Sequence, residues 1–264
     1  MMTVGLPAYG RTMIPLKDDA PRLTTPYMTY FLLAANIIVF LFEVILQGSG
    51  QRALERFIFQ FGVVPVRIPI ALLNGGYVPQ DLVHQLGTRF VPPVEAVLPV
   101  FTSMFLHGSW LHLIANMWAL WIFGDNVEDH LGHFLYLVMY LASGIAAALL
   151  HTAFNLGSLV PSVGASGAIA GVMGAYFLLY PSARVLTLLP FFFVFFVWLP
   201  AWIVLGYWFV VQFLSGAATA IVATQSTRAG GGIAFWAHVG GFVAGALLVK
   251  LFPARPRRYR YYGL

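Results

Sequence analysis

The feature that most constrains the fold of this chain is a series of long apolar stretches separated by polar or Pro/Gly-rich segments. A helix that spans a membrane needs about 20 mostly apolar residues. Such stretches lie near residues 27–47, 103–123, 133–154, 165–181, 200–222 and 234–252. Hydrophobic residues make up 60% of the chain and charged residues only 9%. The sequence therefore predicts an all-α, polytopic membrane protein with six transmembrane helices and no separate soluble domain.

Two parts of the chain do not fit this pattern simply. In residues 48–102 the apolar portion is interrupted by Pro65, Arg67 and Pro69, so we interpret it as a long outer loop with interfacial parts. Residues 188–222 are mostly apolar and too long for one simple crossing. The path of residues 188–199 stays open, because they can lie along the interface or lengthen the fifth span.

Basic residues predict how the spans are oriented. Five of the fourteen follow or close the last apolar stretch, as expected for a tail that faces cytoplasm and anionic lipid. With six spans, residues 1–26 are then cytoplasmic as well, residues 27–252 form the membrane domain, and residues 253–264 form a basic cytoplasmic tail. The first 26 residues lack an apolar region with a cleavage site, so we expect no cleaved signal peptide. We expect a multi-pass protein of the cell (inner) membrane.

Under this topology the second, fourth and sixth spans all run from outside to inside, and each begins with unusual polar residues. At 1.5 Å per residue, His112, Ser166 and His238 lie about 5–10 Å below the outer helix ends. Polar side chains are costly in hydrocarbon, so residues that share one depth are candidates for one site. Ser166 and His238 are the candidate nucleophile and base.

Glycine-rich helix faces give these two residues a way to meet. Glycines flank Ser166 and continue along its span, and others follow His238: Gly164, Gly167, Gly171, Gly174, Gly241 and Gly245. Small residues on facing helices let the backbones approach closely. The alternative is simple helix packing, with the serine incidental.

His112 and Asn116 are four residues apart and project from one helix face, as donors to a developing oxyanion would. A metal site of His107, His112 and His238 is an alternative, but no HExxH pattern or nearby carboxylate completes it. Glu43 lies in the first span, and nothing in the sequence ties it to His238. We therefore predict a Ser–His dyad that uses no metal and no cofactor. The chain has no cysteine, which excludes a thiol nucleophile and disulfides.

These residues resemble motifs of the rhomboid family of intramembrane serine proteases. The resemblance covers His107 to Gly132, with His112-x-x-x-Asn116 and Glu128-x-x-x-Gly132, then Gly164-Ala165-Ser166-Gly167 to Tyr176, then His238-x-x-Gly241-x-x-x-Gly245. The blocks follow the order of the family, and together they are far more specific than any one alone.

The resemblance implies a six-helix bundle with a water-accessible cavity open to the outer side. It implies Ser166 as the nucleophile and His238 as the general base, with oxyanion donors from His112, Asn116 and the backbone N–H of Ser166. His107 would line the cavity. The implied substrates are single-pass membrane proteins, cut at a small residue near the outer membrane boundary where the helix can unwind. The fifth span and the loop after the first would control entry.

One residue departs from the family pattern. Ala170 stands where some relatives carry an aromatic ring against the catalytic histidine, so the way in which His238 is held stays open. Glu128 and Gly132 are expected to shape the turn between the second and third spans.

Other functions remain as alternatives at this stage. A non-catalytic rhomboid-like protein that binds membrane clients would not need the dyad. A transporter would more commonly show inverted repeats or ionisable residues near the bilayer centre, and the sequence shows neither. The expected partners are transmembrane protein substrates and membrane lipid, and the net charge of +5 does not indicate nucleic acid. The sequence leaves the physiological substrate and the oligomeric state open.

Overall fold

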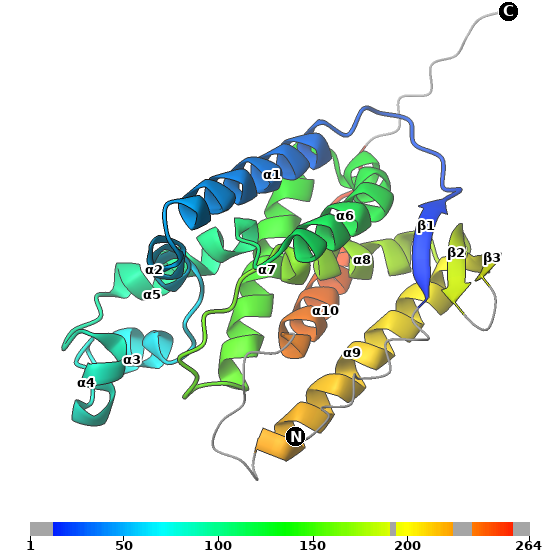
Figure 1. Cartoon of the computed structure of the whole chain (residues 1–264). Coiled ribbons are helices and arrows are strands. Elements are labelled where there is room, and N and C mark those ends of the chain that lie inside the picture. The colour runs from blue at the N-terminus through cyan, green and yellow to red at the C-terminus, as the bar shows by residue number, and fades with distance from the viewer. Residues whose placement is uncertain (1–12, 191–193, 224–233, 256–264) are drawn as a thin grey trace, which may run out of the picture.

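A computed structural model describes residues 13–190, 194–223 and 234–255 of the chain. Its larger helices are α1 (Tyr27–Gly48), α6 (Trp110–Leu131), α7 (His133–Ala153), α8 (Ser166–Leu179), α9 (Ala201–Ala223) and α10 (Phe235–Leu251). Helices α6, α7, α8 and α10 pack together, and α9 lies at the edge of this group (Figure 1). Three short strands form a small sheet beside the start of α9. The all-α prediction is wrong in this detail, although helices dominate the fold.

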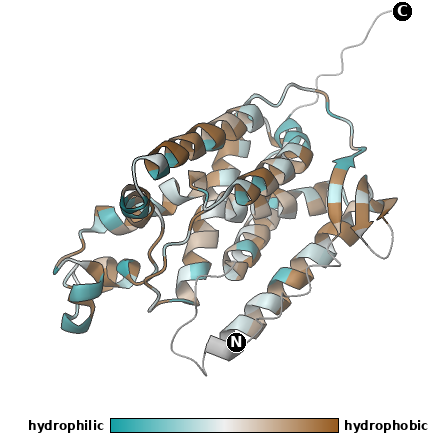
Figure 2. Ribbon diagram, viewed as in Figure 1, coloured by the Kyte–Doolittle hydropathy of each residue, from teal (hydrophilic) through white to brown (hydrophobic). Residues whose placement is uncertain are grey.

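Three described helices are long and apolar enough to cross a membrane: α1, α7 and residues Ala201–Thr219 of α9. A fourth candidate crossing joins residues Pro93–Phe105 to α6 across a bend of 77°. Helices α8 and α10 have 14 and 17 residues, or about 21 and 26 Å. By length and composition, the described residues thus support three to four crossings, fewer than the six predicted. Hydrophobic residues cover much of α1, whereas hydrophilic ones gather on the short helices at the left of the view (Figure 2).

The predicted second span begins too early. Residues 103–105 form a short 3-10 turn, η2 (Ser103–Phe105), and α6 starts only at Trp110. The hydroxyl of Ser109 accepts the backbone N–H of His112 at 3.2 Å, which caps the new helix after Gly108. The cap therefore sets the beginning of α6, and the apolar pattern does not show it.

Residues 48–102, predicted as a long outer loop with interfacial parts, are largely helical. This segment folds into four helices: α2 (Gln51–Phe61), α3 (Arg67–Leu73), α4 (Gln80–Leu86) and α5 (Pro93–Thr102). Pro69 lies in the first turn of α3 and Pro93 is the first residue of α5, where a missing N–H breaks no helical hydrogen bond. The segment buries its own apolar cluster, formed by Val64, Val66, Ile70, Ala71, Val78, Leu86, Val91 and Ala96.

The described part of residues 188–199 does not lengthen the helix of the fifth span, which was one of the two paths that the sequence left open. It belongs to an antiparallel hairpin of β2 (Arg184–Pro190) and β3 (Val194–Pro200). A third strand, β1 (Ile14–Asp18), pairs with β2, so the order is β1-β2-β3. The β-branched and aromatic residues of the hairpin favour strands, and α9 begins directly after Pro200. Residues 191–193 lie outside the described chain.

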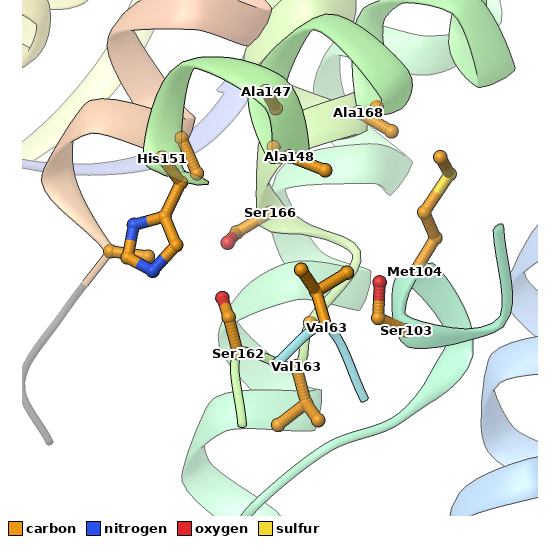
Figure 3. Close-up of a pocket in the computed structure, with 15 residues that line it drawn as sticks. Val63, Ser103, Met104, Ala147, Ala148, His151, Ser162, Val163, Ser166 and Ala168 are labelled. Atoms are coloured by element: carbon orange, nitrogen blue, oxygen red, sulfur yellow. The ribbon is translucent and has the colours of Figure 1, made fainter. Parts of the chain in front are cut away.

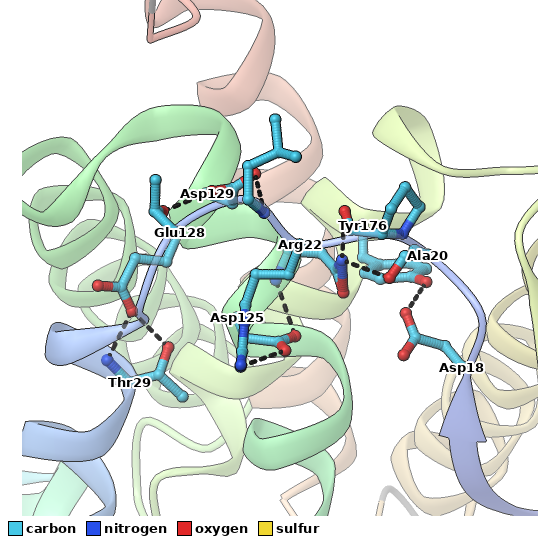
Figure 4. A network of polar contacts seen from close by, with 12 residues as sticks. Asp18, Ala20, Arg22, Thr29, Asp125, Glu128, Asp129 and Tyr176 are labelled. Atoms are coloured by element: carbon cyan, nitrogen blue, oxygen red, sulfur yellow. Dashed lines mark hydrogen bonds and ion pairs between the residues drawn. The ribbon is translucent and has the colours of Figure 1, made fainter. Parts of the chain in front are cut away.

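Glu128, near the end of α6, connects this helix to α1 at one end of the bundle (Figure 4) and also contacts α7. Its fully buried carboxylate accepts the backbone N–H groups of Met28 and Thr29 at 2.8 and 2.7 Å, and lies 2.5 Å from Nδ1 of His133. Gly132 follows with φ of 79°, a conformation that favours glycine and lets α6 turn into α7. Both residues shape this turn, as expected.

The segment before α1 crosses the same end of the bundle (Figure 4). Arg22 lies 3.1 Å from the Asp125 carboxylate of α6, and Asp18 accepts the hydroxyl of Tyr176 in α8. These contacts connect β1 to α8, and the segment after β1 to α6. Residues 1–12 of the predicted N-terminal segment, and residues 256–264 of the predicted basic tail, lie outside the described chain.

Candidate active site

The backbones of α8 and α10 touch along a seam of glycines. A methyl group on Gly241 would lie 1.9 Å from the carbonyl oxygen of Gly167. The same group on Gly245 would lie 1.9 Å from the carbonyl oxygen of Gly171. Both distances are far below van der Waals contact, so only glycine permits this approach. The seam brings the beginnings of α8 and α10 next to each other.

The remaining glycines of this group have different neighbours. A methyl group on Gly174 would meet the backbone of Phe242 in α10 at 2.0 Å, whereas one on Gly167 would meet the side chain of Ala147 in α7 at 2.6 Å. Gly164 precedes α8 and has φ of 132°, a conformation that favours glycine. Its role is therefore in the turn that leads into α8, and not in the packing of two helices.

Ser166 and His238 are in hydrogen-bond contact. Ser166 is the first residue of α8 and His238 lies in the first turn of α10. The distance between Ser166 Oγ and His238 Nε2 is 2.8 Å. The imidazole is buried, with 9% of the residue exposed. A half-buried hydroxyl and a buried imidazole at this distance can exchange a proton.

Two residues of α9 hold the other side of the imidazole. Nδ1 of His238 lies 2.8 Å from Oε1 of Gln212. The indole of Trp208 packs on the imidazole, with centroids 5.6 Å apart and an angle of 36°. Ala170 is fully buried and has no ring to offer. Sequence reasoning missed both partners, although a lone amide in an apolar helix is a signal that invites attention.

His112 lies beside the turn that leads into α8. A methyl group on Gly164 would be 2.7 Å from Nε2 of His112 and 3.6 Å from Oγ of Ser166. Asn116 is one turn further along the same face of α6, and only 6% of it is exposed. Its Nδ2 has no hydrogen-bond partner among the described residues. A buried N–H without a partner is costly, and an anionic oxygen would satisfy it.

His107 packs behind His112. Their ring centroids are 5.1 Å apart, and the backbone N–H of His107 donates to Glu43 Oε2 at 3.0 Å. Only 2% of each of His107 and Glu43 is exposed. The sequence pattern did not indicate a link between Glu43 and the site. The hydrogen bond from the backbone N–H of His107 to Glu43 provides one. The described residues contain no group of three His, Asp or Glu side chains that could hold a metal ion.

Ser166 opens into a cavity of about 40 Å³ (Figure 3), which has room for water. Residues from α7, from the turn before α8 and from the start of α10 line it together with Val63. The ring of His151, near the end of α7, also lines the cavity and lies to one side of Ser166 (Figure 3). His107, His112, Asn116 and His238 are not among the residues that line this cavity.

The family model of the Rhomboid domain matches residues 95–255, which is more than half of the chain. The chain belongs to the rhomboid family. The resemblance seen in the sequence is thereby confirmed, and the matched segment contains Ser166 and His238. With its long apolar helices, the chain is an integral membrane protein.

Individual relatives support the same assignment. The chain is 34% identical over 164 residues to "Rhomboid protein 1, mitochondrial" of Saccharomyces cerevisiae, covering 58% of this chain and 41% of that protein. It is 29% identical over 157 residues to "RHOMBOID-like protein 1" of Arabidopsis thaliana, covering 58% and 40%. It is 36% identical over 96 residues to "Presenilin-associated rhomboid-like protein A, mitochondrial" of Danio rerio, covering 35% and 25%. The chain thus spans less than half the length of these rhomboid proteins.

Proposed function

We propose that this rhomboid is an intramembrane serine endopeptidase, which cleaves single-pass transmembrane proteins near the outer membrane boundary. The proposal depends above all on the 2.8 Å contact between Ser166 Oγ and His238 Nε2. Rhomboid proteins are generally intramembrane serine proteases, but some members are inactive. A non-catalytic client-binding protein would have no use for a hydroxyl held against an imidazole.

The proposed reaction begins when Ser166 Oγ attacks the carbonyl carbon of the scissile bond and His238 Nε2 takes the hydroxyl proton. The carbonyl oxygen becomes an anion, which the backbone N–H of Ser166 and the side chains of His112 and Asn116 would stabilise. The C–N bond then breaks, and His238 gives its proton to the departing amine. Water hydrolyses the acyl ester on Ser166 by the same two steps. This sequence of steps uses no metal and no cofactor.

The length of α8 supports a reaction below the membrane surface. Its 14 residues extend about 21 Å, whereas the hydrocarbon layer is about 30 Å thick. If the Leu179 end reaches the inner boundary, Ser166 lies about 9 Å below the outer one. The cavity at Ser166 would admit water to that depth. A substrate helix must unwind there, because its carbonyls are otherwise held in intrahelical hydrogen bonds.

We also propose that α1, α6, α7, α8, α9 and α10 all cross the membrane, within a domain of residues 27–252. Residues 48–102 would then lie on the outer side and both termini in the cytoplasm. The distribution of Lys and Arg favours this orientation, and we propose the cell (inner) membrane as the location. Two of the relatives above are named as mitochondrial. Those names describe the location of the relatives and not that of this chain. Lipid and transmembrane substrates are the proposed partners.

Cleavage of a tagged single-pass reporter by the purified, reconstituted protein tests the proposal. The wild type should cut at one site in the outer part of the reporter span, as mapped by mass spectrometry. Ser166→Ala and His238→Ala should abolish the cut, whereas the matched controls Ser158→Ala and His84→Ala should not. Cleavage that persists in purified Ser166→Ala protein would contradict the proposal.

A further inference from the structure

His238 has a partner on each ring nitrogen, and the two partners come from different helices. Nε2 faces the hydroxyl of Ser166 in α8, and Nδ1 faces the amide oxygen of Gln212 in α9, both at 2.8 Å. Trp208 lies one helical turn before Gln212 on the same face of α9 and packs on the imidazole ring. The ring is thus fixed at both nitrogens and on its face.

The identity of the atom at Nδ1 determines the tautomer of His238. An amide oxygen accepts hydrogen bonds and cannot donate them. With Gln212 Oε1 at 2.8 Å, the proton of the neutral imidazole belongs on Nδ1. Nε2 then presents its lone pair to the hydroxyl of Ser166, which is the arrangement that a general base requires. The opposite tautomer would turn an N–H toward Ser166 and leave Gln212 facing a lone pair.

We propose that Gln212 is a positioning residue for the reaction proposed above: its amide oxygen fixes the tautomer and orientation in which His238 deprotonates Ser166. This inference rests on the proposed function. A neutral amide suits the location, because a carboxylate in an apolar helix would carry a large desolvation cost. Trp208 supplies the ring contact that Ala170 does not.

The contact also makes the base dependent on α9. Around Gln212, α9 and α10 meet through aromatic side chains. The ring centroids of Phe209 and Phe242 are 4.7 Å apart, and those of Phe213 and Trp236 are 6.0 Å apart. Helix α9 lies at the edge of the bundle (Figure 1). A displacement of α9 from α10 would remove Gln212 from His238 together with the indole of Trp208. The dyad is then fully oriented only while α9 is packed in place.

The tautomer of His238 can be measured directly. In protein with ¹⁵N-labelled histidine, seven histidines give imidazole signals, and His238→Ala identifies that of His238. The wild type should carry its proton on Nδ1. Gln212→Met has a similar volume but no acceptor, so a form with the proton on Nε2 should appear. The control Gln85→Met, on an exposed face of α4, should leave the signal unchanged.

Rescue of activity separates positioning from simple packing. Gln212→Met should lower kcat for reporter cleavage about tenfold with little change in KM, the effect of losing one hydrogen bond to the base. Gln212→Glu, as an uncharged carboxylic acid in this apolar helix, keeps a carbonyl oxygen as acceptor and should recover most of that loss. Equal activity of the Met variant and the wild type, or equal loss in the Met and Glu variants, would overturn the inference.

The two proposals fail in different ways. A proton on Nε2 of His238 in the wild type would overturn the role of Gln212, even if Gln212→Met does not fold. So would an unchanged tautomer in a folded Gln212→Met protein. Cleavage that does not depend on Ser166 would instead overturn the proposed function, and the tautomer spectra do not depend on cleavage.

Discussion

Among single residues, His238 shows how an imidazole can be held among apolar helices by neutral partners. Its described ring contacts are a hydroxyl, an amide oxygen and an indole, from Ser166, Gln212 and Trp208. Each is neutral, so none adds the cost of a buried charge. Glu43 is a buried carboxylate of α1, and it accepts the backbone N–H of His107.

Nδ2 of Asn116, which has no hydrogen-bond partner among the described residues, leads to a kinetic prediction. Asn116→Ala should lower kcat about 100-fold with a smaller change in KM, because an oxyanion donor acts mainly in the transition state. Steady-state cleavage of the reporter measures both constants. Asn74→Ala, which removes an exposed amide at the end of α3, should behave like the wild type. An unchanged kcat in Asn116→Ala would remove this residue from the oxyanion site.

The sequence could predict some of these residues and not others. Ser166, His238 and His112 stand out because each is polar near the start of an apolar stretch. Gln212 and Trp208 do not, because the apolar pattern of α9 does not tell which of its faces meets α10. The link from Glu43 to His107 uses a backbone N–H, which no side-chain pattern reveals.

At the scale of helices and strands, the glycine seam between α8 and α10 gives a stability prediction. Gly241→Ala and Gly245→Ala each place a methyl group 1.9 Å from a carbonyl oxygen, so the helices must separate. We expect a loss of about 1–3 kcal/mol or more in the free energy of unfolding, together with loss of reporter cleavage. Unfolding in mixed detergent micelles measures the first.

Gly206→Ala is the matched control for the seam. A methyl group there would lie 3.7 Å from the ring of Phe177, an ordinary contact, so stability and cleavage should stay near the wild-type values. If Gly241→Ala were as stable and as active as Gly206→Ala, close backbone contact would not be needed to bring Ser166 to His238.

The attachment of β1 to the hairpin should depend on pH. Hydrogen bonds from the backbone and side chain of Arg184 lower the pKa of Asp19 below its ordinary value of 3.8. A carboxyl with a lowered folded-state pKa stabilises the fold above its unfolded pKa, and the contribution is lost as pH falls through the folded pKa. Burial raises the pKa of Asp18, which acts in the opposite sense. The informative quantity is therefore the difference between the wild type and Asp19→Asn.

Hydrogen exchange of the β1 amides measures this difference. Protection in the wild type should exceed that in Asp19→Asn above about pH 4, and the two should converge in more acidic buffer. A gap that stayed constant down to about pH 2 would show that ionisation of Asp19 plays no part.

Elements were predicted well where long apolar stretches decide them, as for α1 and α7. The failures have local causes. Prolines in residues 48–102 looked like helix breakers, but Pro69 and Pro93 occupy first turns, where proline is tolerated. The hairpin β2–β3 is as apolar as a span, so hydropathy alone could not separate a membrane helix from a pair of strands.

For the whole molecule, the shared depth of Ser166, His238 and His112 depends on an even number of crossings. Accessibility tags on the two termini of the reconstituted or cell-expressed protein should report the same side of the membrane. The side should be cytoplasmic, as the basic residues indicate. Tags on opposite sides would imply an odd number of crossings and would break the proposed topology, although the described contact between Ser166 and His238 does not depend on it.

The most direct test of the proposed Ser166–His238 dyad measures whether Ser166 is an activated nucleophile. Purified wild-type protein should react covalently with a fluorophosphonate, and mass spectrometry should place the adduct on Ser166. His238→Ala should slow this labelling by at least about 100-fold, Ser166→Ala should abolish it, and His84→Ala should leave it unchanged. Labelling of the wild type at another residue, or equal labelling rates in the wild type and His238→Ala, would contradict a catalytic Ser166–His238 dyad.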